Sequence, residues 1–104
     1  MFSLCLSVTL LSAPYLDVVR DVRNLTDAPV AIYHVSGEYA MLWHAAAAGA
    51  FGLAEGVLEA LGGAKRAGAS ILITYFTPFL LKHMREQQDK ARAVALAESE
   101  GKAL

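Results

Sequence analysis

Two short runs of apolar and β-branched residues, each followed by a helical pattern, constrain this chain more than any other feature. Residues 30–35 read VAIYHV and residues 70–76 read SILITYF. Strands that are apolar on both faces are typical of parallel sheets covered by helices. The order helix, strand, helices, strand, helix therefore predicts an α/β fold of parallel βα units, from either a doubly wound sheet or a barrel.

The predicted sheet is incomplete. Two parallel strands leave unpaired N–H and C=O groups and apolar faces at their edges. The chain is also 56% apolar, with a mean hydropathy of +0.41, which is high for a domain of 104 residues. This surplus predicts surface that more chain, a partner subunit or lipid would cover, so we expect a piece of a larger structure.

Helical patterns fill the rest of the chain. They cover residues 15–23, 38–48 and 53–67, and a last one opens at Thr77-Pro78. Pro14 and Pro78 stand where a first-turn proline is tolerated. We expect Ser36 to cap its helix and Gly68 to end the third helix in a left-handed conformation. The charged stretch from 82 to 102 predicts a solvated helix or a frayed tail.

Charge and cysteine content exclude several classes of protein. With 9 Lys+Arg against 10 Asp+Glu, the chain lacks the basic face of a nucleic-acid binder. Cys5, the single cysteine, forms neither an internal disulfide nor a cysteine-based zinc site.

The three histidines predict no metal site. No two of them are paired at helical spacing, and no carboxylate partner is close to them in sequence (His34, His44 and His83). Glu38 lies in the first turn of its predicted helix, so the simplest interpretation is that its negative charge interacts with the helix dipole.

The first 15 residues carry no charge. This stretch is shorter than the roughly 20 residues of a membrane-spanning helix and lacks the positive start of a signal peptide. The alternation of apolar residues from Leu4 to Leu10 has the period of a strand. A targeting role is the alternative, but we expect a cytoplasmic chain with no membrane or nucleic-acid partner.

Hydroxyl groups gather at the carboxyl ends of the two predicted strands. Tyr33 and Ser36 follow the first strand, and Thr74, Tyr75 and Thr77 end the second. Ligands of α/β proteins bind at this edge. Hydroxyls beside the first N–H groups of a helix suit a carboxylate or a phosphate. The alternative is that Ser36 only caps its helix and that the tyrosines fill space.

The chain contains four longer motifs, which are PYLDVVR at 14–20, YHVSGEYAM at 33–41, KRAGA at 65–69 and ITYFTP at 73–78. Their order and spacing resemble the C-terminal part of the 5-aminolevulinate dehydratase family, also called porphobilinogen synthase. The resemblance runs from about Pro14 to about Met84. It divides the chain into an unmatched apolar leader (1–13), a C-terminal barrel segment (14–84) and a charged helical tail (85–104).

The resemblance implies a fold and an activity. The fold would be the C-terminal βα units of a TIM (β/α)8 barrel, here an incomplete one. The activity would be that of a lyase that condenses two molecules of 5-aminolevulinate to porphobilinogen with loss of water, in haem and tetrapyrrole synthesis. Ser36 and Tyr75 match residues that hold a substrate carboxylate, and Tyr33 matches a tyrosine of the same pocket. The family uses zinc or magnesium and forms large homo-oligomers.

The departures from the family pattern concern its chemistry. The family forms Schiff bases through two lysines, and the position of the second corresponds to Leu10 here. The first lysine and the zinc cysteines have no counterpart in these residues, and Ser70 stands where an aspartate is common. The resemblance therefore predicts a C-terminal portion or isoform with no catalytic residue and no metal ligand of its own, inactive alone. The alternative is a non-catalytic protein that associates with full-length dehydratase subunits.

Overall fold

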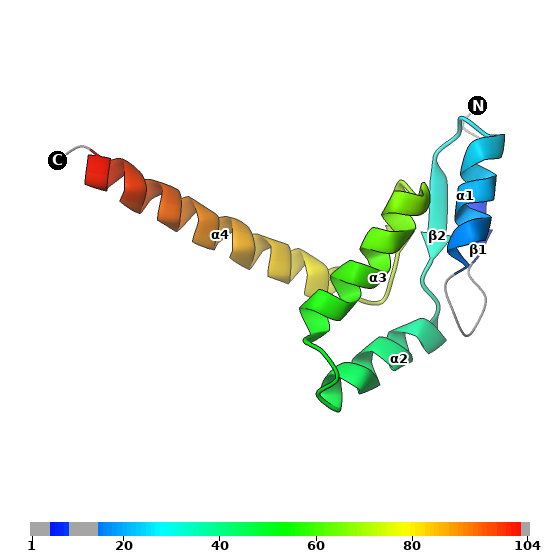
Figure 1. Ribbon diagram of the computed structural model, residues 1–104, viewed down its shortest axis with the longest axis horizontal. Helices are drawn as coiled ribbons and strands as arrows, with labels where there is room; N and C mark the ends of the chain where they lie inside the picture. Colours follow the sequence, from blue (N-terminus) through cyan, green and yellow to red (C-terminus); the bar gives the residue numbers. More distant parts are fainter. Residues whose placement is uncertain (1–4, 9–14, 103–104) are drawn as a thin grey trace.

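The computed structural model describes residues 5–8 and 15–102. Its elements are β1 (Cys5–Val8), α1 (Leu16–Leu25), β2 (Val30–Tyr33), α2 (Ser36–Ala47), α3 (Leu53–Ala67), β3 (Ile71–Ile73) and α4 (Thr77–Lys102). Figure 1 shows α1 and α3 beside the strands, α2 at one end of this body, and α4 extending away from it. The order of elements confirms an α/β chain of successive βα units.

The sheet has three parallel strands in the order β1-β2-β3. Cys5 lies opposite Val30, and Ala31 lies opposite Ile71. The predicted parallel pairing of 30–35 with 70–76 is confirmed. The strand interpretation of the first residues is also confirmed for β1, while Leu4, Leu10 and Pro14 lie outside the described residues. The expected sheet therefore gains a third strand, because β1 supplies the second neighbour that β2 needs.

The second predicted strand is shorter and more exposed than expected. It ends at Ile73, and residues 74–76 form a turn instead. The Thr74 hydroxyl accepts a hydrogen bond from the Phe76 N–H at 3.1 Å, which replaces a bond of the strand ladder. Ile71 and Ile73 are 40% and 41% exposed. The prediction of a buried strand over 70–76 is therefore wrong, because β3 lies at the edge of this sheet.

The helices form largely where their patterns predict them, with one correction at α2. Ser36 is the first residue of α2, and the residue before it, Val35, is the extended N-cap. Ser36 therefore does not cap this helix. The Glu38 carboxylate accepts a hydrogen bond from the Val35 N–H at 3.3 Å, which satisfies a donor at the helix start. Gly68 ends α3 at φ +129°, as expected of a terminating glycine.

Two groups of buried side chains form the core. The first lies between α1, α3 and the sheet and consists of Val19, Val30, Ile32, Ala64 and Ala69. The second lies between α3 and the start of α4 and consists of Val57, Leu61 and Phe76, with partly buried side chains from α2 and α4 around them. Both groups depend on the apolar face of α3.

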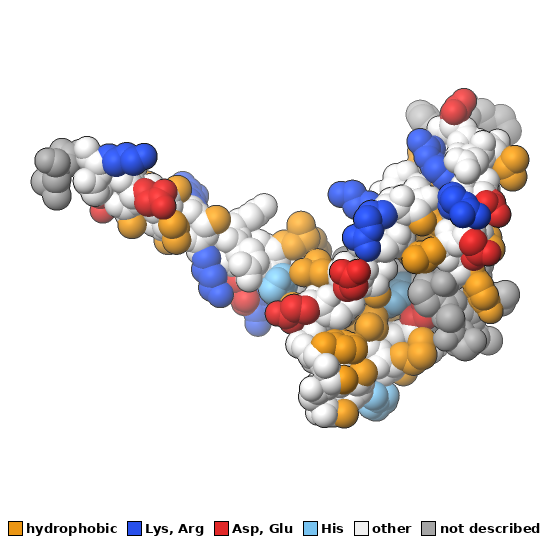
Figure 2. Space-filling model, viewed as in Figure 1, with side chains coloured by type: hydrophobic (Ala, Val, Ile, Leu, Met, Phe, Trp, Pro, Cys, Tyr) orange, Lys and Arg blue, Asp and Glu red, His pale blue; other side chains and the backbone are white. Residues whose placement is uncertain are grey.

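The last helix is mostly surface. Within the described range of α4 no side chain is buried. Figure 2 shows charged side chains of both signs along it, while hydrophobic side chains gather over α2 and the beginning of α3. The expectation of a solvated helix is confirmed. Among the described residues, no helix has both the length and the apolar character to cross a membrane.

Candidate functional site

Tyr33 and Tyr75 meet at the carboxyl ends of β2 and β3. Their hydroxyl oxygens are 2.9 Å apart, and their rings lie edge to face with centroids 6.3 Å apart. The two residues are 42 positions apart in the chain, and parallel pairing of the strands brings them together. The predicted meeting of hydroxyls at one edge of the sheet is confirmed for this pair.

The electrostatics of this pair favour a neutral phenol at Tyr33. The hydrogen bond with Tyr75 is the main cause that raises the pKa of Tyr33 above its ordinary value, and burial and the charge of Tyr75 add to it. A phenol that stays protonated is a hydrogen-bond donor. A protonated Tyr33 hydroxyl can donate a hydrogen bond to an anionic group at this edge of the sheet.

Ser36 lies at the same end of the sheet. It is exposed and begins α2, three residues after Tyr33. The first N–H groups of a helix have no partner within it, and the helix dipole is positive there. Ser36 thus adds a hydroxyl next to an electropositive helix end, on the segment that follows Tyr33.

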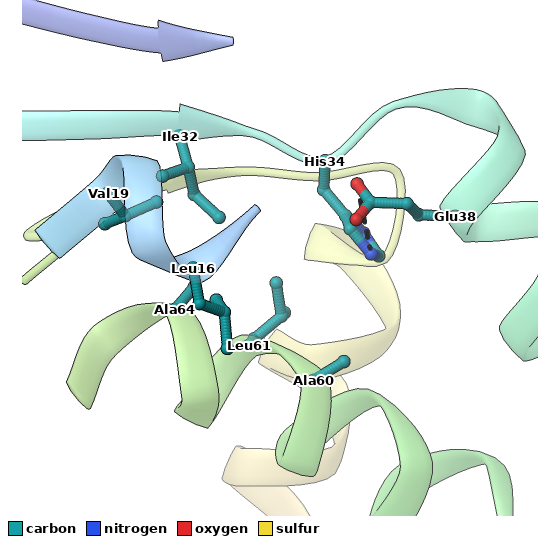
Figure 3. A pocket seen from close by; sticks show the side chains of 8 residues that line it. All are labelled: Leu16, Val19, Ile32, His34, Glu38, Ala60, Leu61 and Ala64. Carbon is teal, nitrogen blue, oxygen red and sulfur yellow. Dashed lines mark ion pairs between the residues drawn. The ribbon is translucent and has the colours of Figure 1, made fainter. Parts of the chain in front are cut away.

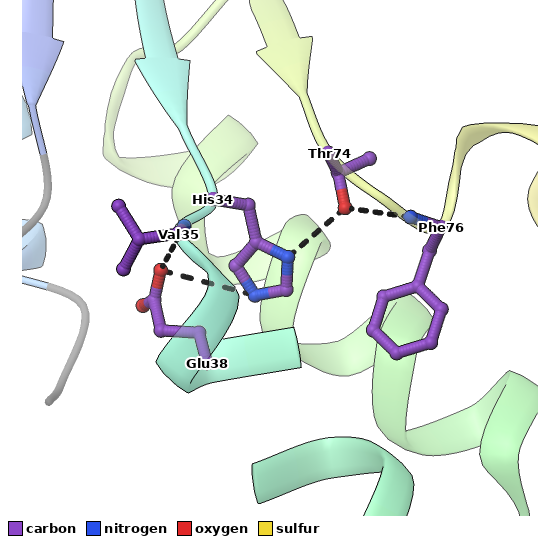
Figure 4. Close-up of polar contacts among 5 residues, drawn as sticks. All are labelled: His34, Val35, Glu38, Thr74 and Phe76. Carbon is purple, nitrogen blue, oxygen red and sulfur yellow. Dashed lines mark hydrogen bonds and ion pairs between the residues drawn. The ribbon is translucent and has the colours of Figure 1, made fainter. Parts of the chain in front are cut away.

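His34 points to the opposite face of the sheet from Tyr33, because successive side chains of a strand alternate. It is buried, with 4% of its surface exposed. Its Nδ1 lies 3.0 Å from the Thr74 hydroxyl, which also accepts the Phe76 N–H (Figure 4). A second polar contact, behind the tyrosine pair, therefore joins the ends of β2 and β3.

Glu38 completes this buried group. Its Oε2 lies 3.9 Å from His34 Nε2, and both side chains are about 95% buried. The prediction that His34 has no carboxylate partner near in sequence is wrong, since Glu38 follows four residues later. The spacing of four residues between His34 and Glu38 is visible in the sequence. It did not predict a contact, because His34 ends a strand pattern and Glu38 lies at the start of a helix. The assignment of Glu38 to the helix start is supported by its bond to the Val35 N–H.

A small cavity adjoins His34 and Glu38 on the helix side (Figure 3). It measures about 20 Å³, enough for one water molecule. Its other lining residues are Leu16, Val19, Ile32, Ala60, Leu61 and Ala64. This cavity is too small for an organic substrate, while a larger pocket of about 210 Å³ lies next to it, lined by His34, Glu38, Met41, Leu42 and Ala60.

Metal ligands do not converge in the described part of the chain. Among residues 5–8 and 15–102, no group of three or more His, Cys, Asp or Glu side chains is placed to hold an ion. The buried His34–Glu38 pair offers two donors, short of the three or four that protein zinc sites use. These two side chains therefore do not fit a resident metal.

A family model, delta-aminolevulinic acid dehydratase, matches residues 11–83. The chain belongs to the delta-aminolevulinic acid dehydratase family. The resemblance read from the four sequence motifs is therefore confirmed. The matched range contains Tyr33, Ser36 and Tyr75, and it ends within the first part of α4.

Comparison with known dehydratases shows what share of a full-length family member this chain covers. The enzyme of Macaca fascicularis is 57% identical over 71% of this chain and 23% of its own length. The chloroplastic enzyme of Chlamydomonas reinhardtii is 52% identical over 61% of this chain and 16% of its length. A crystal structure from Toxoplasma gondii, holding the product porphobilinogen, superposes with a TM-score of 0.61 at 42% identity, over 68% of this chain and 20% of that one. The chain spans less than a quarter of these relatives.

Burial of His34 makes folding of this dehydratase segment sensitive to acid. Burial is the main cause that lowers the pKa of His34, and the nearby Glu38 carboxylate partly opposes it. The unfolded chain then binds a proton more readily than the folded one, so stability is full above about pH 6.5 and falls below it. We expect a slope of at most about 1.4 kcal/mol per pH unit, measured by urea unfolding at several pH values.

The matched control separates His34 from the other histidines. His34→Asn removes the titrating ring and should flatten this slope, whereas His44→Gln, at an exposed position of α2, should leave it unchanged. Equal slopes in the wild type and His34→Asn would contradict the assignment.

Proposed function

We propose that this chain supplies the substrate-carboxylate rim of a delta-aminolevulinic acid dehydratase, with Ser36, Tyr75 and Tyr33 as the residues that hold the acid group. The observation that carries this proposal is the 2.9 Å approach of the Tyr33 and Tyr75 hydroxyls at the carboxyl ends of two parallel strands. Both residues lie within the range that matches the family. The acid named in the family's description offers the carboxylate that such donors suit.

The rim would bind by exchanging one set of hydrogen bonds for another. In the free chain the two phenols share one hydrogen bond. A carboxylate lying against both hydroxyls would accept both O–H groups, and charge-assisted bonds are stronger than the neutral bond they replace. Ser36 would contribute a third hydroxyl from the positive end of α2. These residues bind and orient the substrate; forming the new bonds of the product falls to groups elsewhere in the dehydratase.

The strands β2 and β3 would belong to consecutive βα units of a TIM barrel, with residues 14–84 as the barrel segment and 85–104 as a helical tail, and β1 pairs with β2 from the stretch before this segment. The parallel order β1-β2-β3 supports this, since a barrel of this kind is a closed series of such units. The rest of the barrel would come from the part of the dehydratase that these residues do not represent. The use of zinc or magnesium, the assembly into a homo-oligomer and the cytoplasmic location stay predictions. The location can be tested with a fluorescent fusion protein.

Turnover by these 104 residues alone is not expected. A Schiff base needs a lysine whose amine is held partly unprotonated inside a pocket. Leu10, outside the described residues, occupies the position that the family resemblance assigns to one such lysine. The lysines in the described part are exposed at positions 65, 82, 90 and 102. Incubation with 5-aminolevulinate and borohydride should give no lysine adduct and no porphobilinogen; either product contradicts this proposal.

Carboxylate binding tests the rim directly. Levulinate, which carries the acid group without the amine, should shift the NMR signals of Tyr33, Ser36 and Tyr75 in the full chain. Removing one hydroxyl with Tyr75→Phe should weaken binding by about ten- to a hundredfold, the effect of one hydrogen bond to a charged group. Tyr15→Phe, at an exposed tyrosine before α1, is the matched control and should change nothing. Equal affinities of Tyr75→Phe and the wild type would exclude Tyr75 from the rim.

A second candidate function is association with full-length dehydratase subunits. The exposed Ile71 and Ile73 on the edge strand β3 favour it, because an apolar strand edge pairs readily with another chain. Co-purification with the full-length enzyme would support this role. A soluble monomer that unfolds cooperatively and captures no full-length subunit would contradict it.

A further inference from the structure

We propose that His34 is a positioning residue, which holds the segment of Tyr75 and the segment of Ser36 in fixed relation to each other. The inference rests on the proposed carboxylate rim, because these two segments carry its hydroxyls. His34 itself lies behind the rim, on the helix side of the sheet, and touches no ligand bound there. Its side chain contacts one segment through each ring nitrogen.

The first contact fixes the turn that carries Tyr75. The His34 N–H donates to the Ile73 carbonyl at 2.8 Å and extends the strand pairing by one residue. His34 Nδ1 then lies 3.0 Å from the hydroxyl of Thr74, the residue just before Tyr75. His34 thus fixes the end of β3 through both its backbone and its side chain.

Thr74 forms hydrogen bonds with the two residues that follow Tyr75. Its hydroxyl accepts the Phe76 N–H at 3.1 Å, and its carbonyl accepts the Thr77 hydroxyl at 2.8 Å. These bonds close a turn around Tyr75, whose side chain is 53% exposed and whose ring contacts the rings of Tyr33 and Tyr39. The backbone that carries Tyr75 is therefore linked to Thr74, and Thr74 is linked to His34.

The second contact reaches the start of α2. His34 Nε2 faces the Glu38 carboxylate at 3.9 Å, and that carboxylate accepts the Val35 N–H directly before Ser36. The cavity beside the pair has room for a water molecule that would bridge this distance. The carboxylate facing Nε2 favours the imidazole tautomer that carries its proton on Nε2. Nδ1 is then unprotonated and accepts a hydrogen bond from the Thr74 hydroxyl. One run of polar contacts, two hydrogen bonds and the longer contact between His34 and Glu38, then extends from Phe76 through Thr74 and His34 to Glu38 (Figure 4).

Three substitutions separate the contacts of the ring. His34→Leu removes both contacts and keeps an apolar side chain of similar size. In His34→Asn the amide takes the place of Nδ1, so the Thr74 contact stays and the Glu38 contact is lost. Thr74→Val removes the hydroxyl alone and keeps the shape of the side chain. If His34 positions Tyr75, His34→Leu and Thr74→Val should behave alike, and His34→Asn should resemble the wild type in the position of Tyr75.

Two quantities are measured in the full chain. The first is the ring contact between Tyr33 and Tyr75, observed by NMR without ligand, and the second is the affinity for levulinate. We expect His34→Leu and Thr74→Val to lose the ring contact and to bind levulinate about tenfold more weakly. His34→Asn should keep the ring contact and bind levulinate with an intermediate affinity, because only its contact to Glu38 at the Ser36 segment is lost. In the wild type, the ring 15N shifts should report a neutral ring with its proton on Nε2, and Thr74→Val should move the Nδ1 signal.

Two results would overturn the inference, and the design separates them from failure of the rim. If Thr74→Val keeps the ring contact, His34 does not position Tyr75. If His34→Asn loses the ring contact as His34→Leu does, the ring acts through its bulk and not through Nδ1. If wild-type chain binds no levulinate, the proposed rim fails, while the ring contact measured without ligand still decides the role of His34. Thr74→Val also keeps the test open if His34→Leu does not fold.

Discussion

Replacing Phe76 with alanine is expected to destabilise the chain by about 3–5 kcal/mol, enough to unfold a large share of it at room temperature. Phe76 is 2% exposed and belongs to the buried group with Val57 and Leu61. Its ring packs against Tyr39, with centroids 4.6 Å apart. The substitution removes the largest fully buried side chain and leaves a cavity between α3 and the start of α4. Urea unfolding followed by circular dichroism measures the loss.

A matched variant on α4 controls for the loss of apolar side chain as such. Leu81 is 63% exposed, so Leu81→Ala should change stability by less than about 0.5 kcal/mol. Phe76→Leu keeps most of the buried volume and should fall between the two. A loss below about 1 kcal/mol for Phe76→Ala would mean that the second core group does not hold the helices together.

Gly68→Ala is expected to cost about 2–4 kcal/mol, the second largest effect. Gly68 ends α3 at φ +129°, a conformation that side chains rarely adopt. An added Cβ would also lie 2.5 Å from Cγ and 2.7 Å from Cβ of Arg23, too close for either atom. These are the inner atoms of the Arg23 side chain, so α1 itself would have to move away from the end of α3. The loss is measured by the same urea unfolding.

Two other glycines separate the backbone effect from the clash. Gly49 also has a positive φ, +85°, but a Cβ there meets nothing within 4 Å, so Gly49→Ala should show the backbone cost alone, about 1–2 kcal/mol. Gly101 lies in α4 with open space around it, and alanine there should stabilise the helix slightly. Equal losses at Gly68 and Gly49 would show that Arg23 yields without cost.

The proposed rim and the core are joined at Phe76. Its ring fills the second core group, while its N–H bonds to the Thr74 hydroxyl behind Tyr75. Destabilising this core should therefore displace the exposed tyrosine pair before it unfolds the sheet. This arrangement places a solvent-facing site on a turn that buried groups hold, as binding sites generally require.

The sequence predicted the site better where the determining contacts follow from strand direction. Parallel strands with hydroxyls after their last residues lead directly to the meeting of Tyr33 and Tyr75. It failed where a side chain's role depended on burial. The spacing of the histidines predicts a packed or exposed His34, but not its contact with Thr74, which lies forty positions away in the chain. Ser36 was expected to cap α2, but a neighbouring carboxylate takes part of that task.

What the sequence by itself determined was the type of each main element, the direction of the sheet and the family. Hydrophobic period, turn residues and motif spacing are local properties of the chain, and they need no knowledge of distant contacts. Only the tertiary structure decided that Cys5–Val8 joins the sheet, that β3 ends at Ile73, and that His34 lies between Thr74 and Glu38. These outcomes depend on which groups lose contact with water together, and a buried polar atom bonds to whatever partner the fold brings within reach.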